Sequence, residues 1–65
     1  MKYQDLYATF KTRHAHGTEA ALVAALRDCH DTLQVGGYAA DHPYGQRLWA
    51  EIDAIRDIRL KRKHD

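Results

Sequence analysis

Apolar residues recur at helical spacing in three successive segments of this chain, and this pattern constrains the fold more than any other feature. The first segment follows the i, i+3, i+4, i+7 rule of one helix face, with Tyr3, Leu6, Tyr7 and Phe10. The second has the 4-3-4 spacing of a seam between paired helices, with Leu22, Leu26, Cys29 and Leu33. The third repeats the helical spacing, with Tyr44, Leu48, Ile52, Ile55 and Ile58. Because no segment alternates as a strand would, the predicted fold class is all-α.

Glycine, threonine and proline mark the ends of these segments. Gly17 is expected to end the first helix in a left-handed conformation, and Thr18 is a good N-cap for the second helix. Gly36 and Gly37 end the second helix, and Pro43 suits the first turn of the third. The predicted helices therefore cover about residues 2–15, 18–35 and 43–63.

The chain is short for a self-sufficient core. Its 65 residues are expected to form one domain, residues 1–65, of a size at which burial is marginal. Many of its apolar residues are alanines, so Trp49, Phe10 and the leucines are expected to supply most of the core. The second and third helices are predicted to form a long antiparallel hairpin against which the first packs. Two such units are expected to associate into a homodimeric helical bundle, with Leu22, Leu26 and Leu33 partly between the subunits.

Five histidines and one cysteine raise the question of a metal site or a nucleophile. His14 and His16 are expected in the last turn of the first helix, where they point about 200° apart and cannot hold one ion. Cys29 is predicted to be buried, and its neighbour His30 points about 100° away, which suits neither zinc ligands nor a Cys–His nucleophile. The glycines match neither of the common phosphate-binding patterns. We therefore expect no metal, no cofactor and no enzymatic activity.

The remaining function class is protein interaction. The stretch of residues 36–49 gathers side chains of the types that most often anchor interfaces. The predicted partner-binding residues are Tyr38, Tyr44, Arg47 and Trp49. We expect Trp49 to straddle the edge of the core and Arg47 to point to solvent. The leading hypothesis is a small helical module that binds and modulates a protein partner. By analogy of size and composition alone, it could be an accessory or inhibitor protein of a phage, a plasmid or a bacterial operon.

A positive block at the end of the third segment supports an alternative. Half of the ten lysines and arginines fall in the last ten residues. The candidate nucleic-acid contacts are Arg56, Arg59, Lys61, Arg62 and Lys63. The net charge of the whole chain is only +1, which gives little of the phosphate attraction that dominates DNA affinity, so a nucleic-acid-associated regulator is the second hypothesis. Since no apolar run reaches the length of a membrane span and no signal-peptide core begins the chain, we expect no membrane partner and a cytosolic location.

Overall fold

The computed structural model describes residues 2–38 and 41–64, and within these residues it is helical with no strands. The helices are α1 (Tyr3–His14), α2 (Glu19–Gly36) and α3 (Pro43–His64). The predicted all-α class with three helices is thereby confirmed. Ala39 and Ala40, in the middle of the expected second loop, lie outside the described residues. None of the described helices combines the length and apolar character needed to cross a membrane.

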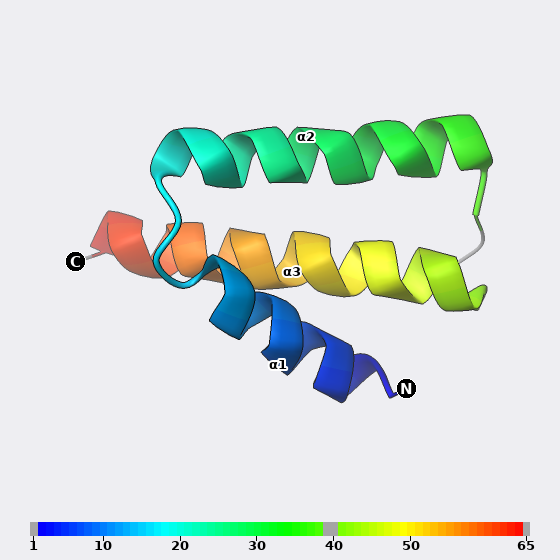
Figure 1. Cartoon of the computed structure of the whole chain (residues 1–65), viewed down its shortest axis with the longest axis horizontal. Helices are drawn as coiled ribbons and strands as arrows, with labels where there is room; N and C mark the ends of the chain where they lie inside the picture. The colour runs from blue at the N-terminus through cyan, green and yellow to red at the C-terminus, as the bar shows by residue number, and fades with distance from the viewer. Residues whose placement is uncertain (1, 39–40, 65) are drawn as a thin grey trace.

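The central element of the fold is α3. It packs against α2 on one side and against α1 on another, whereas α1 and α2 make far fewer contacts with each other. Figure 1 shows α2 and α3 side by side and running in opposite directions, with α1 crossing α3 obliquely from the other side. The molecule measures 34 × 23 × 17 Å. Because α1 and α2 contact different sides of α3, part of its surface remains exposed, including Trp49 and Leu60.

Local interactions explain how α2 begins and ends. The Thr18 side chain accepts a hydrogen bond from the backbone N–H of Ala21 at 3.1 Å, which confirms the predicted N-cap. At the other end Gly37 has φ 60° and ψ 32°, and its N–H donates to the carbonyl of Leu33. Since L side chains disfavour this left-handed conformation, the glycine ends the helix as predicted.

The end of α1 differs from the prediction. Ala15 keeps a right-handed conformation and donates to the carbonyl of Thr12, while Gly17 donates to the carbonyl of His14 at 3.0 Å. Among the described residues only Gly37 has a positive φ, so the left-handed stop expected at Gly17 is wrong. These i→i−3 bonds satisfy the carbonyls of Thr12 and His14 without a left-handed residue. His16, expected in the last turn, lies beyond the helix.

The core is divided between the two contact surfaces of α3. On the α1 side, the ring of Phe10 packs against Ala50 and Ala54, whose small side chains allow close approach. On the α2 side there are two further clusters of buried residues: Leu22 with Ile55 and Ile58, and Cys29 with Leu48 and Ile52. The expectation that Trp49 supplies much of the core is wrong, because its side chain is 39% exposed; this exposure agrees with the other expectation, that Trp49 lies at the edge of the core. The two faces of α3 that carry the core are occupied by aliphatic residues and alanines instead.

Candidate functional site

One side of α3 carries large side chains that α1 and α2 leave partly exposed. They are the exposed residues Trp49, Arg56, Leu60 and Lys63, and we call this set the α3 ridge. At about 100° per residue the four positions fall within an arc of about 60°, and they extend along about 21 Å of the helix. Trp49 and Leu60 are the apolar members and are 39% and 52% exposed.

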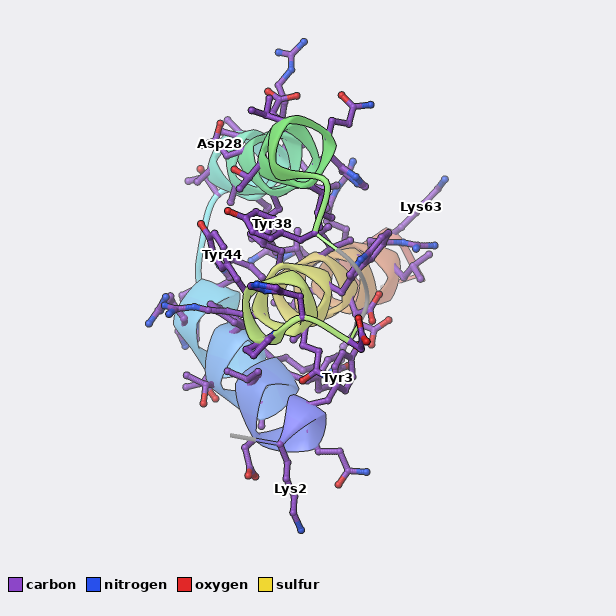
Figure 2. All side chains as sticks on the ribbon, turned by 90° about the vertical axis from the view of Figure 1, so that its right-hand side faces the viewer. Lys2, Tyr3, Asp28, Tyr38, Tyr44 and Lys63 are labelled. Atoms are coloured by element: carbon purple, nitrogen blue, oxygen red, sulfur yellow. The ribbon has the colours of Figure 1, made fainter. Side chains whose placement is uncertain are left out.

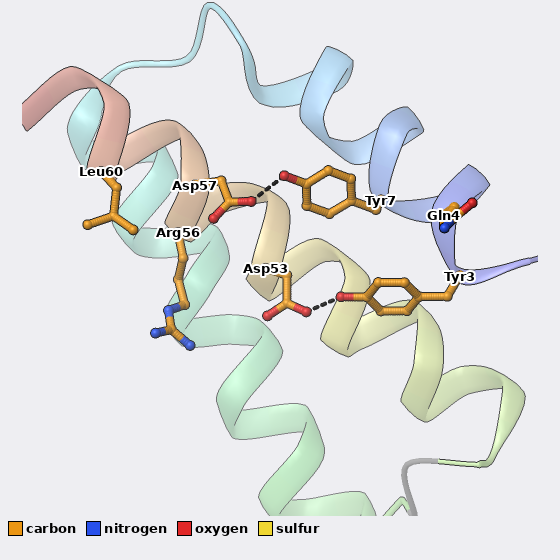
Figure 3. Close-up of a pocket in the computed structure, with 7 residues that line it drawn as sticks. All are labelled: Tyr3, Gln4, Tyr7, Asp53, Arg56, Asp57 and Leu60. Atoms are coloured by element: carbon orange, nitrogen blue, oxygen red, sulfur yellow. Dashed lines mark hydrogen bonds between the residues drawn. The ribbon is translucent and has the colours of Figure 1, made fainter. Parts of the chain in front are cut away.

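A groove of about 400 Å³ separates the ridge from α1 (Figure 3). Its wall is formed by two tyrosines of α1 that donate hydrogen bonds to carboxylates of α3, Tyr3 to Asp53 and Tyr7 to Asp57. Burial, then the hydrogen bond to Asp53, raise the pKa of Tyr3 to about 12. The hydrogen bond to Asp57 and burial raise the pKa of Tyr7 above its usual value. The two hydrogen bonds hold α1 against α3, and the carboxylates of Asp53 and Asp57 line this wall of the groove.

A second groove of about 590 Å³ lies on the α2 side of the ridge and is basic. Its lining residues are Glu19, Arg56, Arg59, Leu60, Arg62 and Lys63. Arg59 forms an ion pair with Glu19 of α2, and Arg62 donates to the carbonyl of Ala15 at 3.0 Å. Two of the basic residues predicted as nucleic-acid contacts are therefore engaged within the chain. Arg56 and Lys63 take part in no ion pair within the described residues.

The fifth predicted nucleic-acid contact, Lys61, is also exposed but lies apart from the basic groove. Five residues separate it from Arg56, which corresponds to about 140° around the helix. The positive block of the sequence is thus distributed over different sides of α3, and only part of it faces the ridge.

Two of the predicted partner-binding residues meet at the connection between α2 and α3. The rings of Tyr38 and Tyr44 are 4.8 Å apart at an angle of 66°, and Tyr38 also lies 5.1 Å from the ring of His42. Tyr38 is half-buried, whereas Tyr44 is 43% exposed. Figure 2 shows Tyr44 on one side of the molecule and Lys63 on the other. These tyrosines are therefore separate from the α3 ridge.

The other two predicted residues point in different directions. Arg47 is exposed, and its guanidinium lies 5.8 Å from the centre of the Phe10 ring. Trp49 meets the ring of His30 edge-on, with centroids 6.5 Å apart. A separation of two residues places Arg47 and Trp49 about 160° apart around α3. Of the four residues proposed from the sequence, only Trp49 belongs to the ridge, and the four do not form one continuous surface.

A polar contact that the sequence did not reveal joins all three helices at Glu51. One carboxylate oxygen lies 3.1 Å from Nε2 of His14 in α1, and the other accepts a hydrogen bond from the thiol of Cys29 in α2 at 3.4 Å. Burial, together with the charge of Glu51, raises the pKa of Cys29 to about 12. The thiol is thus protonated, the opposite of an activated nucleophile. Within the described residues, no group of three or more histidine, cysteine or acidic side chains is arranged to hold a metal ion.

Comparison of the chain with models of known protein families, with curated proteins and with solved structures yields no match. The candidate site is therefore defined by the geometry of the ridge and of its two grooves.

Proposed function

We propose that this chain is a small helical module that binds and modulates a protein partner through the α3 ridge. The observation that carries the proposal is the exposure of Trp49 and Leu60, 39% and 52%, on the side of α3 that its neighbours leave open. Tryptophan is enriched among the side chains that dominate binding energy, and a flanking arginine such as Arg56 belongs to the same group. Apolar anchors with a charged rim are typical of protein interfaces.

The contacts beneath the ridge support a binding role because they hold it in place. On one side the hydrogen bonds from Tyr3 and Tyr7 fasten α1 to α3, and on the other the ion pair between Arg59 and Glu19 fastens α2. A surface that is already ordered loses less conformational entropy when a partner binds. The ridge is therefore suited to present its side chains without rearrangement of the helices.

We further propose that α2 and α3 act as one antiparallel hairpin and that two copies of the chain associate into a helical bundle. Leu22 is fully buried within a single chain, so a second copy would use other apolar surface. Leu26 and Leu33 are only half-buried and Tyr44 is 43% exposed, which supports such a contact. Sedimentation should give the mass of a dimer at micromolar concentration, and a stable monomer there would remove this part of the proposal.

A matched pair of substitutions tests the ridge. Leu60→Glu places a negative charge on the ridge, and Val35→Glu makes the same kind of change at an α2 position that is 90% exposed. We expect the tagged wild-type chain and the Val35→Glu variant to retain the same protein from the native host, and the Leu60→Glu variant to lose it. All three should have the same helical circular dichroism, since exposed changes usually cost less than about 0.5 kcal/mol. If no retained protein depends on Leu60, the proposal is wrong.

A further inference from the structure

The charges beside the ridge specify the chemistry of its partner. Leu60 lies one turn after Arg56 and one turn before Lys63, and all three line the basic groove on the α2 side. Within the described residues neither cation has an ion-pair partner. An exposed leucine between two available cations is complementary to an apolar side chain flanked by carboxylates.

We propose that the α3 ridge binds an acidic amphipathic helix of the partner protein. Its apolar face lies on Trp49 and Leu60, and its carboxylates meet Arg56 and Lys63. This inference rests on the proposed function, because it assigns the partner's chemistry at the same surface.

The dimensions of the ridge match a helix. Trp49, Arg56 and Lys63 are spaced seven residues apart, which is the repeat by which two packed helices keep one seam in contact. The ridge length of about 21 Å corresponds to about 14 residues of a partner helix. Grooves of about 400 and 590 Å³ lie on either side of Arg56 and Leu60, so side chains of the partner can enter both at this part of the ridge.

The opposite charges of the two grooves set the orientation of the partner. The α1-side groove is lined by the carboxylates of Asp53 and Asp57 and by the cation Arg56, so its formal net charge is negative. The α2-side groove is lined by four cations, Arg56 among them, and by the one carboxylate of Glu19, so its formal net charge is positive. An amphipathic helix can place its acidic side chains on the basic groove and neutral ones on the acidic groove. A nucleic acid, which carries phosphates along both strands, would bring negative charge to Asp53 and Asp57 as well. The observations therefore favour an acidic helix over a nucleic acid.

Fluorescence of Trp49, the one tryptophan of the chain, provides the test. The probe is a synthetic amphipathic peptide of about 18 residues with leucines on one face and glutamates beside them, long enough to span the ridge. A second peptide carries lysine in place of every glutamate, and a short DNA duplex is the third probe. We expect saturable binding of the glutamate peptide, with affinity about tenfold or more above that of the lysine peptide, because like charges suppress the wrong partner.

Charge-reversal variants locate the contact. Arg56→Glu and Lys63→Glu should each lower the affinity for the glutamate peptide and raise the affinity for the lysine peptide. Lys61→Glu is the matched control, because it makes the same change about 140° around the helix from Arg56, and it should leave both affinities within about twofold of the wild type. The proposal is overturned if the glutamate peptide does not bind, if Lys61→Glu acts as strongly as Arg56→Glu, or if the duplex binds through Arg56 and Lys63 and the peptide does not. Equal binding of both peptides that is lost in Leu60→Glu would refute the acidic chemistry and leave the proposed function intact. Retention of the native partner by Leu60→Glu would refute the proposed function itself.

Discussion

Replacing Leu22 by alanine is expected to remove a large share of the free energy of unfolding. Leu22 is completely buried and packs against Ile55 and Ile58 of α3. The change deletes three carbon atoms, and at about 0.8 kcal/mol for each buried CH₂ the lost transfer free energy is about 2.4 kcal/mol. The cavity left behind raises the total to about 3–4 kcal/mol, within the usual range for a buried leucine. A domain of this length has about 3–10 kcal/mol in all, so the variant should be close to unfolding.

Urea unfolding followed by far-ultraviolet circular dichroism measures this loss, and Val23→Ala is the matched control. Val23 is the next residue along α2 but is 41% exposed, so its truncation should change the free energy of unfolding by less than about 1 kcal/mol. Equal losses at the two positions would refute the packing described here. A loss at Leu22 that depends on protein concentration would place this residue between subunits instead of within one chain.

Other predictions concern single contacts. Because the pKa of Tyr3 is raised to about 12, its hydrogen bond to Asp53 stabilises the fold fully below about pH 10 and is lost as the pH rises through about 12. The melting temperature of the wild type should therefore be higher than that of Tyr3→Phe at neutral pH. A difference in melting temperature that persists above pH 12 would count against the contact. Cys29 is 5% exposed and its pKa is raised to about 12. A thiol reagent at neutral pH should therefore modify the native chain at least about tenfold more slowly than the urea-unfolded chain. Equal rates of modification would contradict the burial of Cys29. Gly37→Ala should lower the free energy of unfolding by about 1–2 kcal/mol because φ is positive at Gly37. Gly17→Ala should change it by less than about 1 kcal/mol. Urea titrations that give the larger loss at Gly17 would contradict the backbone conformations described for these two glycines.

Features that depend on neighbouring residues were predictable from the sequence. The apolar periodicity indicated three helices, and the roles of Thr18, Gly37 and Pro43 follow from interactions within one turn. Gly17 shows the limit of the same reasoning. A glycine after a helix permits a left-handed stop, but i→i−3 bonds satisfy the carbonyls equally well, and only the path of the following chain decides between them.

Contacts between segments far apart in the sequence were not predictable in this way. The tyrosines at positions 3 and 7 and the aspartates at positions 53 and 57 share an i, i+4 spacing, and this matching spacing is the one signal for their pairing in the sequence. Nothing near Glu51 in the sequence points to His14 or Cys29, because that contact depends on how all three helices cross. The exposure of Trp49 depends in the same way on which faces of α3 are covered. The ridge was therefore predicted only in part: Trp49 was expected as a partner-binding residue, Arg56 and Lys63 were expected as nucleic-acid contacts of the alternative hypothesis, and Leu60 was not expected at all.

Photo-crosslinking from two positions of α3 tests most directly whether the ridge is the binding surface. A photoreactive amino acid replaces Leu60 on the ridge in one variant and Arg47, which lies over the ring of Phe10, in the other. Irradiation of the native host should give a covalent adduct of one defined mass from position 60, with none of that mass from position 47. An adduct from position 47 and none from position 60 would contradict the account and place the partner on the side of Tyr44.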